Sequence, residues 1–191
     1  MRTTRLNKAI SGIREGKLIV YPTDTLYGLA ADIFNASAVK KIYQVKRRPL
    51  DLPLPVMVSD ISMLKKIAYM TPPAEKIIAK FLPGPLTIIL KKKQIVPDSI
   101  TQDKVAIRMP KNNIALYLAS CSGPLTATSA NIHGGQDPCT IDIARKQIGT
   151  RNIIYLDNGT LPCIPSTIIE PTEDNIIIYR EGAIKKEALY G

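Results

Sequence analysis

The sequence predicts an α/β (α+β) fold in which helices pack on a twisted, mixed β-sheet. Short apolar runs typical of strands alternate with longer segments whose apolar residues recur at helical spacing. The two kinds of segment do not follow a strict βαβ order, which favours a mixed sheet over a fully parallel one. The chain has 191 residues, 45% of them hydrophobic, and no linker or low-complexity segment. We therefore expect a single domain over residues 1–191.

In the N-terminal half, hydrophobic periodicity places a helix first and a strand second. Residues 3–15 carry apolar side chains on one helical face, and Gly16 suits the position after a helix end. Residues 17–21 form a short apolar run typical of a strand, and Asn35 or Ser37 is suited to cap the next helix. By the same criteria we expect a strand at 56–58, helices at 61–68 and from Pro72 to Phe81, and a strand at 86–90 with Lys91, Lys92 and Lys93 as its solvent-exposed exit.

The helix that follows Ser37 ends in cations on its inner face. Its apolar stripe lies within residues 39–43, and the next position on that stripe is Lys46, with Arg48 two residues later. Pro49 is expected to end the helix, because the residue before a proline is disfavoured in the helical conformation. These cations either face a cavity or are ordinary basic residues at the negative end of a helix dipole.

In the C-terminal half, one strand separates an aliphatic face from a basic one. Along residues 104–109, Lys104 and Arg108 alternate with aliphatic residues, a pattern typical of a cavity wall or of an ordinary solvent face. A helix at 112–121 carries an apolar stripe that places Cys121 in the core. The remaining expected elements are a strand at 125–128, a helix at 141–148, strands at 153–156, 167–169 and 176–179, and a short helix at 185–189.

The positive charge is concentrated in the first two-thirds of the chain. The whole chain has 26 Lys and Arg against 16 Asp and Glu, a net charge of +10. Residues 1–110 hold 19 basic and 8 acidic side chains, whereas residues 111–191 hold 7 and 8. This asymmetry indicates an anionic partner, a nucleotide or RNA or both, although a basic surface also serves solubility alone.

The cysteine spacing and the length of the apolar runs indicate the cellular compartment of the protein. Cys121, Cys139 and Cys163 include no C-x-x-C pair, which argues against a disulfide framework and for a reducing cytosol. Their spacing with His133, the single histidine, is poor for a zinc site. The sequence has no signal peptide and no apolar run of about 18 residues. We therefore expect a cytoplasmic protein without membrane contact.

The side chains able to do chemistry are dispersed hydroxyls, an amide and cations. The sequence contains no G-x-x-x-x-G-K-[ST] loop, no G-x-G-x-x-G fingerprint and no Ser-His-Asp or Cys-His arrangement. Such a set is suited to binding a polyanion and stabilising developing charge, and it is unsuited to covalent catalysis. Each hydroxyl taken alone is more often a turn or cap residue. The set comprises Thr23, Thr25, Thr128, Ser129, Ser166, Thr167, Asn131, Lys46, Arg48, Arg108 and Arg180.

Six segments resemble motifs of the YrdC family, in the family's order and spacing. They are residues 21–29 (YPTDTLYGL), 46–49 (KRRP), 83–87 (PGPLT), 105–110 (VAIRMP), 126–131 (TATSAN) and 165–169 (PSTII). The resemblance covers nearly the whole chain, and the chain is similar to the short, single-domain form of the family. Members of this family include threonylcarbamoyl-adenylate synthases.

The resemblance implies both a fold and a reaction. The implied fold is a twisted mixed sheet with helices around a basic, concave cavity. The implied reaction joins L-threonine, bicarbonate and ATP, with Mg2+ accompanying the ATP, into threonylcarbamoyl-adenylate and pyrophosphate. Downstream threonylcarbamoyl-transfer proteins then use the product to modify an adenosine of tRNA.

The resemblance also assigns roles to residues. The threonine contacts would be Thr25, Arg108, the Ala127 backbone and Ser166. The ATP contacts would be Lys46, Arg48, Ser129, Asn131 and Arg180, with Lys46 and Arg48 as the catalytic cations. These roles fit the side chains, since an arginine holds a carboxylate bidentately and cations stabilise charge on transferring phosphates.

At four positions the chain departs from the family pattern. Leu52 stands where many synthases have an asparagine that contacts ATP, and Met57 where some have a histidine near threonine. Lys104 replaces a small hydroxyl residue, and Pro138 or a neighbour replaces a serine. Each departure removes a hydrogen-bond partner, whereas the Ser-Thr-Ile-Ile element at 166–169, which favours a working synthase, is retained.

An RNA-binding module of the same fold, for tRNA or double-stranded RNA, is the alternative function. Binding RNA requires only cations and a complementary shape. An RNA groove would also use exposed aromatic residues, and this chain has few. Its hydroxyl-rich motifs and Asn131 favour the enzyme.

Overall fold

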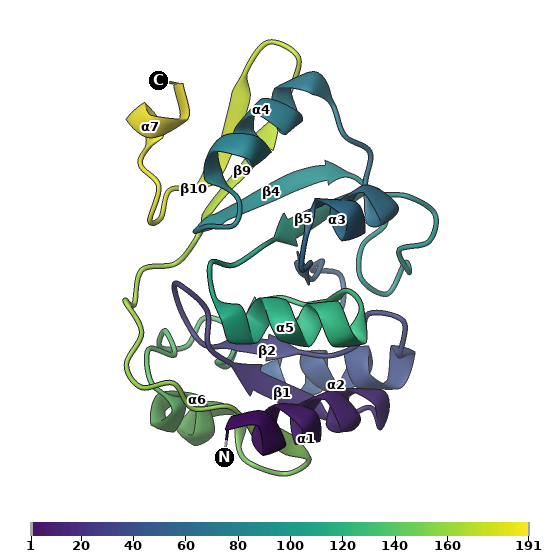
Figure 1. Cartoon of the computed structure of the whole chain (residues 1–191), viewed down its shortest axis with the longest axis vertical. Coiled ribbons are helices and arrows are strands. Elements are labelled where there is room, and N and C mark those ends of the chain that lie inside the picture. The colour runs from purple at the N-terminus through teal and green to yellow at the C-terminus, as the bar shows by residue number, and fades with distance from the viewer. Residues whose placement is uncertain (1, 191) are drawn as a thin grey trace.

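The computed structural model describes residues 2–190 and contains two mixed sheets flanked by helices (Figure 1). Residues 1 and 191 of the predicted domain lie outside the described residues. The mixed α/β class is confirmed, but the prediction of one sheet is wrong. The four-stranded sheet has the order β7 (Thr128–Ser129), β2 (Gly28–Ala30), β1 (Leu18–Tyr21), β8 (Ile153–Tyr155). The six-stranded sheet has the order β10 (Ile176–Arg180), β9 (Thr167–Pro171), β4 (Leu86–Lys91), β5 (Lys104–Arg108), β3 (Val56–Met57), β6 (Leu125–Thr126).

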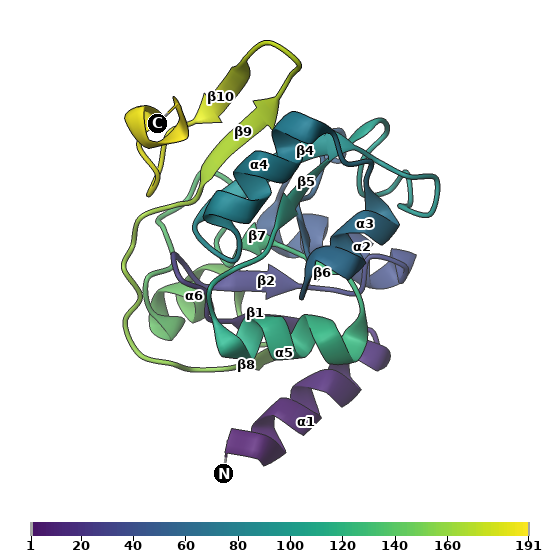
Figure 2. The same cartoon turned by 45° about the horizontal axis from the view of Figure 1, so that its top comes forward.

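The helices divide between the two sheets. In Figures 1 and 2, α3 and α4 lie beside the six-stranded sheet, while α1, α5 and α6 lie near the four-stranded sheet. Within the described part of the chain, no helix is both long and apolar enough to cross a bilayer. The helices are α1 (Arg2–Arg14), α2 (Ala36–Lys46), α3 (Ile61–Ile67), α4 (Pro72–Phe81), α5 (Asn113–Ser122), α6 (Ile141–Ile148) and α7 (Lys186–Tyr190).

The chain passes from one sheet to the other at Ala127. The expected single strand over 125–128 is two short strands, β6 and β7. β6 pairs with β3 in the six-stranded sheet, whereas β7 pairs with β2 in the four-stranded sheet. Between them, the Ala127 N–H donates to the Pro55 oxygen at 2.7 Å. The sequence at 125–128 is compatible with one strand, and it is divided because its two halves pair with strands of different sheets.

Helix α2 begins and ends through local capping. Of the two candidate caps, Asn35 is the N-cap, because its side-chain oxygen accepts the Ala38 N–H at 3.0 Å. The helix ends at Lys46 because Arg47 adopts a left-handed conformation with φ of 50°. The expectation that Pro49 ends the helix is therefore wrong, because the left-handed Arg47 already ends it two residues before the proline.

The buried face of α5 differs from the predicted stripe. Ala115, Leu118 and Ala119 are buried, whereas Tyr117 is exposed and Cys121 is only half-buried. Helix α1 packs against α5 in a second hydrophobic cluster, separate from the main core. The two alanines present no bulky side chain, which favours close helix packing. Ala115 and Ala119 therefore share the buried face with Leu118, in place of the predicted Tyr117 and Cys121.

A disulfide joins Cys139 to Cys163, which contradicts the expectation of unpaired cysteines. Two segments far apart in sequence run side by side here, since the Leu161 N–H donates to the Cys139 oxygen at 2.9 Å. The Cα atoms of the two cysteines are 5.0 Å apart, within the usual range for a disulfide. The tertiary packing of these segments could not be read from cysteine spacing.

The exit of β4 is also less exposed than expected. Lys91 is exposed, but the Lys92 ammonium donates to the Val96 oxygen and pairs with Asp98 at 2.5 Å. The Lys93 ammonium donates to the Lys65 oxygen at 2.7 Å. Lys92 therefore holds the loop that follows the strand, and Lys93 ties the end of the strand to α3.

Candidate active site

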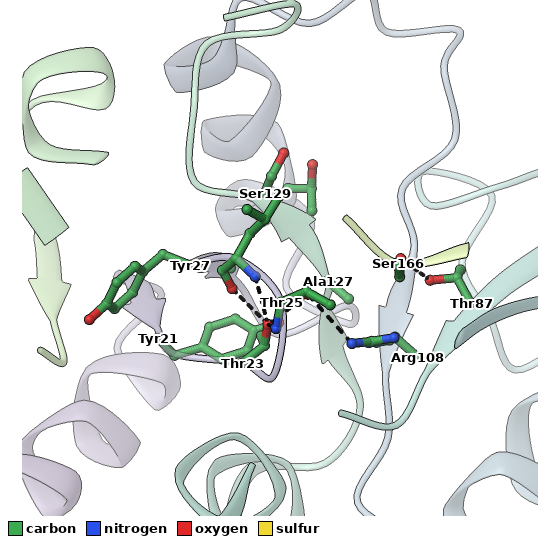
Figure 3. Close-up of a pocket in the computed structure, with 12 residues that line it drawn as sticks. Tyr21, Thr23, Thr25, Tyr27, Thr87, Arg108, Ala127, Ser129 and Ser166 are labelled. Carbon is green, nitrogen blue, oxygen red and sulfur yellow. Dashed lines mark hydrogen bonds between the residues drawn. The ribbon is translucent and has the colours of Figure 1, made fainter. Parts of the chain in front are cut away.

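A small cavity of about 60 Å³ lies where the two sheets meet. All four residues predicted to bind threonine, Thr25, Arg108, Ala127 and Ser166, line this cavity (Figure 3). Thr87 also lines it, because it is paired with Arg108 across β4 and β5. The structure therefore brings together residues that are up to 141 positions apart, from Thr25 to Ser166.

The turn after β1 fixes two hydroxyls in the cavity wall. The Thr23 hydroxyl donates to the Leu26 oxygen at 2.7 Å and accepts the Thr25 N–H at 3.0 Å. Its oxygen also lies 3.0 Å from the Thr25 hydroxyl. The Thr23 oxygen also accepts the Leu26 N–H at 3.2 Å, so backbone groups engage its hydrogen and both of its lone pairs. The Thr25 hydroxyl lines the cavity, where it can hydrogen-bond to a ligand.

Gly28 leaves room for an aromatic ring behind this turn. A Cβ atom at Gly28 would lie 2.5 Å from Cζ of Tyr21, well inside van der Waals contact. Tyr21 is buried, and both residues line the cavity. The glycine in the YPTDTLYGL motif is therefore required by close packing.

Arg108 is a buried cation at the floor of the cavity. Its side chain is 6% exposed, and its Nη2 donates to Asp24 Oδ1 at 2.6 Å. Burial lowers the pKa of Arg108, and the charge of Asp24 opposes that shift. Of the two alternatives predicted for the basic face of β5, Arg108 therefore lies in a cavity wall and not on a solvent face. Asp24 lies in the YPTDTLYGL motif, but it is not among the predicted site residues.

Ser166 lies between a threonine and a second arginine. Its hydroxyl is 2.8 Å from that of Thr87. Arg180 donates from Nη2 to the Ser166 backbone oxygen at 2.8 Å and to its hydroxyl at 3.1 Å. Burial lowers the pKa of Arg180. Thr87 was missed as a site residue, although its position in the PGPLT motif was a signal for it.

Lys46 is buried and points toward the loop that follows β7. Its ammonium donates to the Ser129 oxygen at 2.5 Å, the Asn131 oxygen at 2.7 Å and Asn131 Oδ1 at 3.1 Å. Burial, with a smaller contribution from the charge of Arg48, lowers the pKa of Lys46 to about 7. The three ammonium hydrogens thus match three acceptors, and Lys46 itself does not line the small cavity.

The Lys46-bound loop is closed by further hydrogen bonds. Ser129 donates from its hydroxyl to Asn131 Oδ1 at 2.7 Å, and Asn131 Nδ2 donates to the Gly135 oxygen at 2.9 Å. Ser129 lines the small cavity. Lys46 and Asn131 therefore lie behind the wall that Ser129 forms.

Arg48 lines a second, larger cavity of about 820 Å³. Its Nη2 donates to the Pro53 oxygen at 3.0 Å, and its Nη1 lies 3.2 Å from His133 Nδ1. Burial lowers the pKa of Arg48. Ile89 and Ala106, which also line this cavity, are two residues from Thr87 and Arg108 on the same strands. The two cavities thus open on one face of the six-stranded sheet.

The four departures from the family pattern lie in different surroundings. Met57 is buried in the second hydrophobic cluster. Lys104 pairs with Glu170 at 2.6 Å and lines the larger cavity. The Pro138 oxygen accepts the Tyr27 N–H at 2.9 Å, and Leu52 is half-buried. Only Lys104 therefore changes the charge of a cavity wall.

Comparison with known proteins shows similarity along nearly the whole chain. The family model Sua5/YciO/YrdC, described as telomere recombination, matches residues 11–182. A protein of Methanocaldococcus jannaschii is 44% identical over 178 residues, which cover 93% of this chain and 85% of the relative. The threonylcarbamoyl-AMP synthase of Pyrococcus abyssi is 37% identical, over 97% of this chain and 56% of the relative.

A solved structure of a relative shows the same fold. The crystal structure of P. abyssi Sua5 complexed with L-threonine superposes with a TM-score of 0.89 at 38% identity. The match covers 95% of this chain and 55% of that protein. This chain therefore spans just over half the length of the P. abyssi relative.

Proposed function

The chain belongs to the Sua5/YciO/YrdC family, and we propose that it is a threonylcarbamoyl-AMP synthase. Such an enzyme joins L-threonine, bicarbonate and ATP into threonylcarbamoyl-adenylate and pyrophosphate. The P. abyssi relative carries this name, and a structure of that relative contains L-threonine. The match covers just over half of that relative. The proposed activity would therefore have to reside in the part that the two proteins share.

One observation carries the proposal: a buried guanidinium and several hydroxyls surround one small cavity. Arg108 suits the carboxylate of an amino acid, because a guanidinium donates strong, charge-assisted hydrogen bonds to carboxylate oxygens. The hydroxyls of Thr25 and Ser166 suit a substrate that carries a hydroxyl of its own. The backbone of Ala127, where the chain crosses between sheets, completes the wall.

The chemistry requires positioning and charge stabilisation by the protein. The neutral amine of threonine captures carbon dioxide derived from bicarbonate, and the proton it loses passes to water. A carbamate oxygen then attacks the α-phosphorus of ATP. The new O–P bond forms as the bond from the α-phosphorus to the bridging oxygen breaks, and pyrophosphate leaves with that electron pair. No covalent enzyme intermediate is needed, in keeping with a site of hydroxyls and cations.

We assign the nucleotide to the neighbourhood of the larger cavity. Its phosphates would be held by cations and polar groups in the wall of the small cavity, behind that wall and in the larger cavity, and such cations stabilise the charge of phosphoryl transfer. ATP would enter as its magnesium complex. The residues assigned to the nucleotide are Lys46, Arg48, Ser129, Asn131 and Arg180.

Release of pyrophosphate tests this function. The purified chain with ATP, L-threonine and bicarbonate is expected to release pyrophosphate, and omission of threonine or bicarbonate should abolish the release. Release that does not depend on threonine would contradict the proposal. Binding of tRNA without any pyrophosphate release would favour the RNA-binding alternative.

The product fits a role in tRNA modification. Threonylcarbamoyl-adenylate is an activated acyl phosphate, so its consumer must be a transfer reaction to a nucleophile. We propose that tRNA threonylcarbamoyl-transfer proteins in the cytoplasm take it up. A mixture of this chain, ATP, threonine, bicarbonate, such proteins and unmodified tRNA should yield threonylcarbamoyladenosine, detected by mass spectrometry of tRNA digests.

A further inference from the structure

The ion pair between Asp24 and Arg108 leaves one polar atom of each side chain without a partner. Asp24 Oδ1 accepts from Arg108 Nη2 at 2.6 Å. Among the residues that the structure describes, Asp24 Oδ2 and Arg108 Nη1 are buried and have no hydrogen-bond partner. The side chains are 15% and 6% exposed, respectively. The pair is therefore held by a single hydrogen bond and is largely shielded from solvent.

A pair that served stability alone would be expected to use both of its hydrogen bonds. Bidentate contact between a guanidinium and a carboxylate is the strong geometry. Burial of a charged pair is costly unless its remaining polar atoms are satisfied. The one-sided contact leaves an N–H donor of Arg108 available in the residue that forms the cavity floor.

We propose that Asp24 is a positioning residue for recognition of the substrate carboxylate. Its carboxylate holds Arg108 through Nη2, and this contact keeps Nη1 available for the carboxylate of threonine. Thr25 lies on the same side of the guanidinium, with its hydroxyl 3.5 Å from Nη2, too far to hold the group alone. The inference rests on the proposed function, and it adds a residue that acts through Arg108 rather than on the substrate.

A comparison of two ligands tests this role. Calorimetry without ATP measures the binding of L-threonine and of L-threoninamide, which lacks the carboxylate, to the wild-type chain and to Asp24→Asn. The substitution is expected to weaken threonine binding by about ten-fold or more. It should leave threoninamide binding nearly unchanged, because that ligand makes no charged contact with Arg108. Equal losses for both ligands, or no loss, would overturn the proposal.

Asp157→Asn is the matched control. Asp157 Oδ1 accepts from the Tyr27 hydroxyl at 3.2 Å, so this variant removes an equal charge beside the same turn without touching Arg108. Its ratio of threonine to threoninamide affinity should equal that of the wild type. If Asp24→Asn does not fold, Asp24→Glu, which retains the charge but displaces the carboxylate by one methylene, is compared in the same way.

The design separates the inference from the proposed function. The binding comparison needs no turnover, so a wild-type chain that binds threonine but releases no pyrophosphate contradicts the synthase alone. A carboxylate-specific loss in Asp24→Asn supports the positioning role in either case.

Discussion

The ammonium of Lys46 lies 2.7 Å from the backbone oxygen of Asn131, a residue 85 positions further along the chain. This contact ties the end of α2 to the loop after β7, and Ser129, the last residue of β7, forms part of the cavity wall. Lys46, which continues the inner stripe of α2, thus donates to carbonyl oxygens of a segment far along the chain. Its protonation and the order of the loop are expected to depend on each other.

Stability should rise with pH through the titration of Lys46. Folding lowers the pKa of Lys46 to about 7 from the ordinary 10.5, so between these values the unfolded chain binds more protons. The free energy of unfolding is therefore expected to increase from about pH 7 to pH 10, by at most about 1.4 kcal/mol per pH unit. Urea denaturation at several pH values measures this slope. In Lys46→Met the slope should flatten, and an unchanged slope in that variant would refute the assignment.

Gly28→Ala should distort the cavity. The added Cβ would meet the buried ring of Tyr21 at 2.5 Å, so the ring or the strand must move. We expect a loss of about 1–3 kcal/mol in the free energy of unfolding and weaker threonine binding, measured by thermal melts and calorimetry.

Gly12→Ala provides the control for this substitution. Its Cβ would lie 2.6 Å from Cδ1 of Ile154, the end of a flexible side chain, and Gly12 lies within α1. Alanine also favours helix, so this variant should be nearly neutral. If Gly28→Ala were as stable as Gly12→Ala and bound threonine normally, the close packing inferred at Gly28 would be wrong.

The proposed threonine site should reject valine. A site that hydrogen-bonds a substrate hydroxyl leaves its own polar groups unpaired when that hydroxyl is absent. We expect pyrophosphate release with threonine to exceed that with valine by at least about 100-fold in kcat/KM. Serine keeps the hydroxyl and loses one methyl, worth about 1 kcal/mol, so it should be the stronger competitor. Comparable rates with valine and threonine would exclude the hydroxyl contacts.

The Cys139–Cys163 bond should stabilise the fold. It closes a loop with a sequence separation of 24 residues, for which chain entropy gives about 3.5 kcal/mol. The double variant Cys139→Ser, Cys163→Ser should lose stability by about this amount in urea denaturation. Cys121→Ser, which breaks no bond, is the control. Two free thiols at these positions in the air-oxidised protein, detected by alkylation and mass spectrometry, would contradict the bond.

Local periodicity and motif order determined much of this protein from sequence alone. The helices at 36–46, 61–67 and 72–81 lie where apolar spacing and caps predicted them, because these signals act within a few residues. The six motifs identified the family, which the comparison confirms. They also named five of the residues that line the small cavity, Thr25, Arg108, Ala127, Ser129 and Ser166.

Tertiary structure decided whatever depends on a partner far along the chain. Ala127 separates two strands because β3 and β2, in different sheets, pair with its two flanks. The buried face of α5 is set by α1, and Cys139 meets Cys163 because their segments pack together. Asp24 and Arg108 are likewise neighbours only after folding, 84 positions apart. Such contacts depend on the relative placement of whole elements, and no local pattern of side chains encodes that placement.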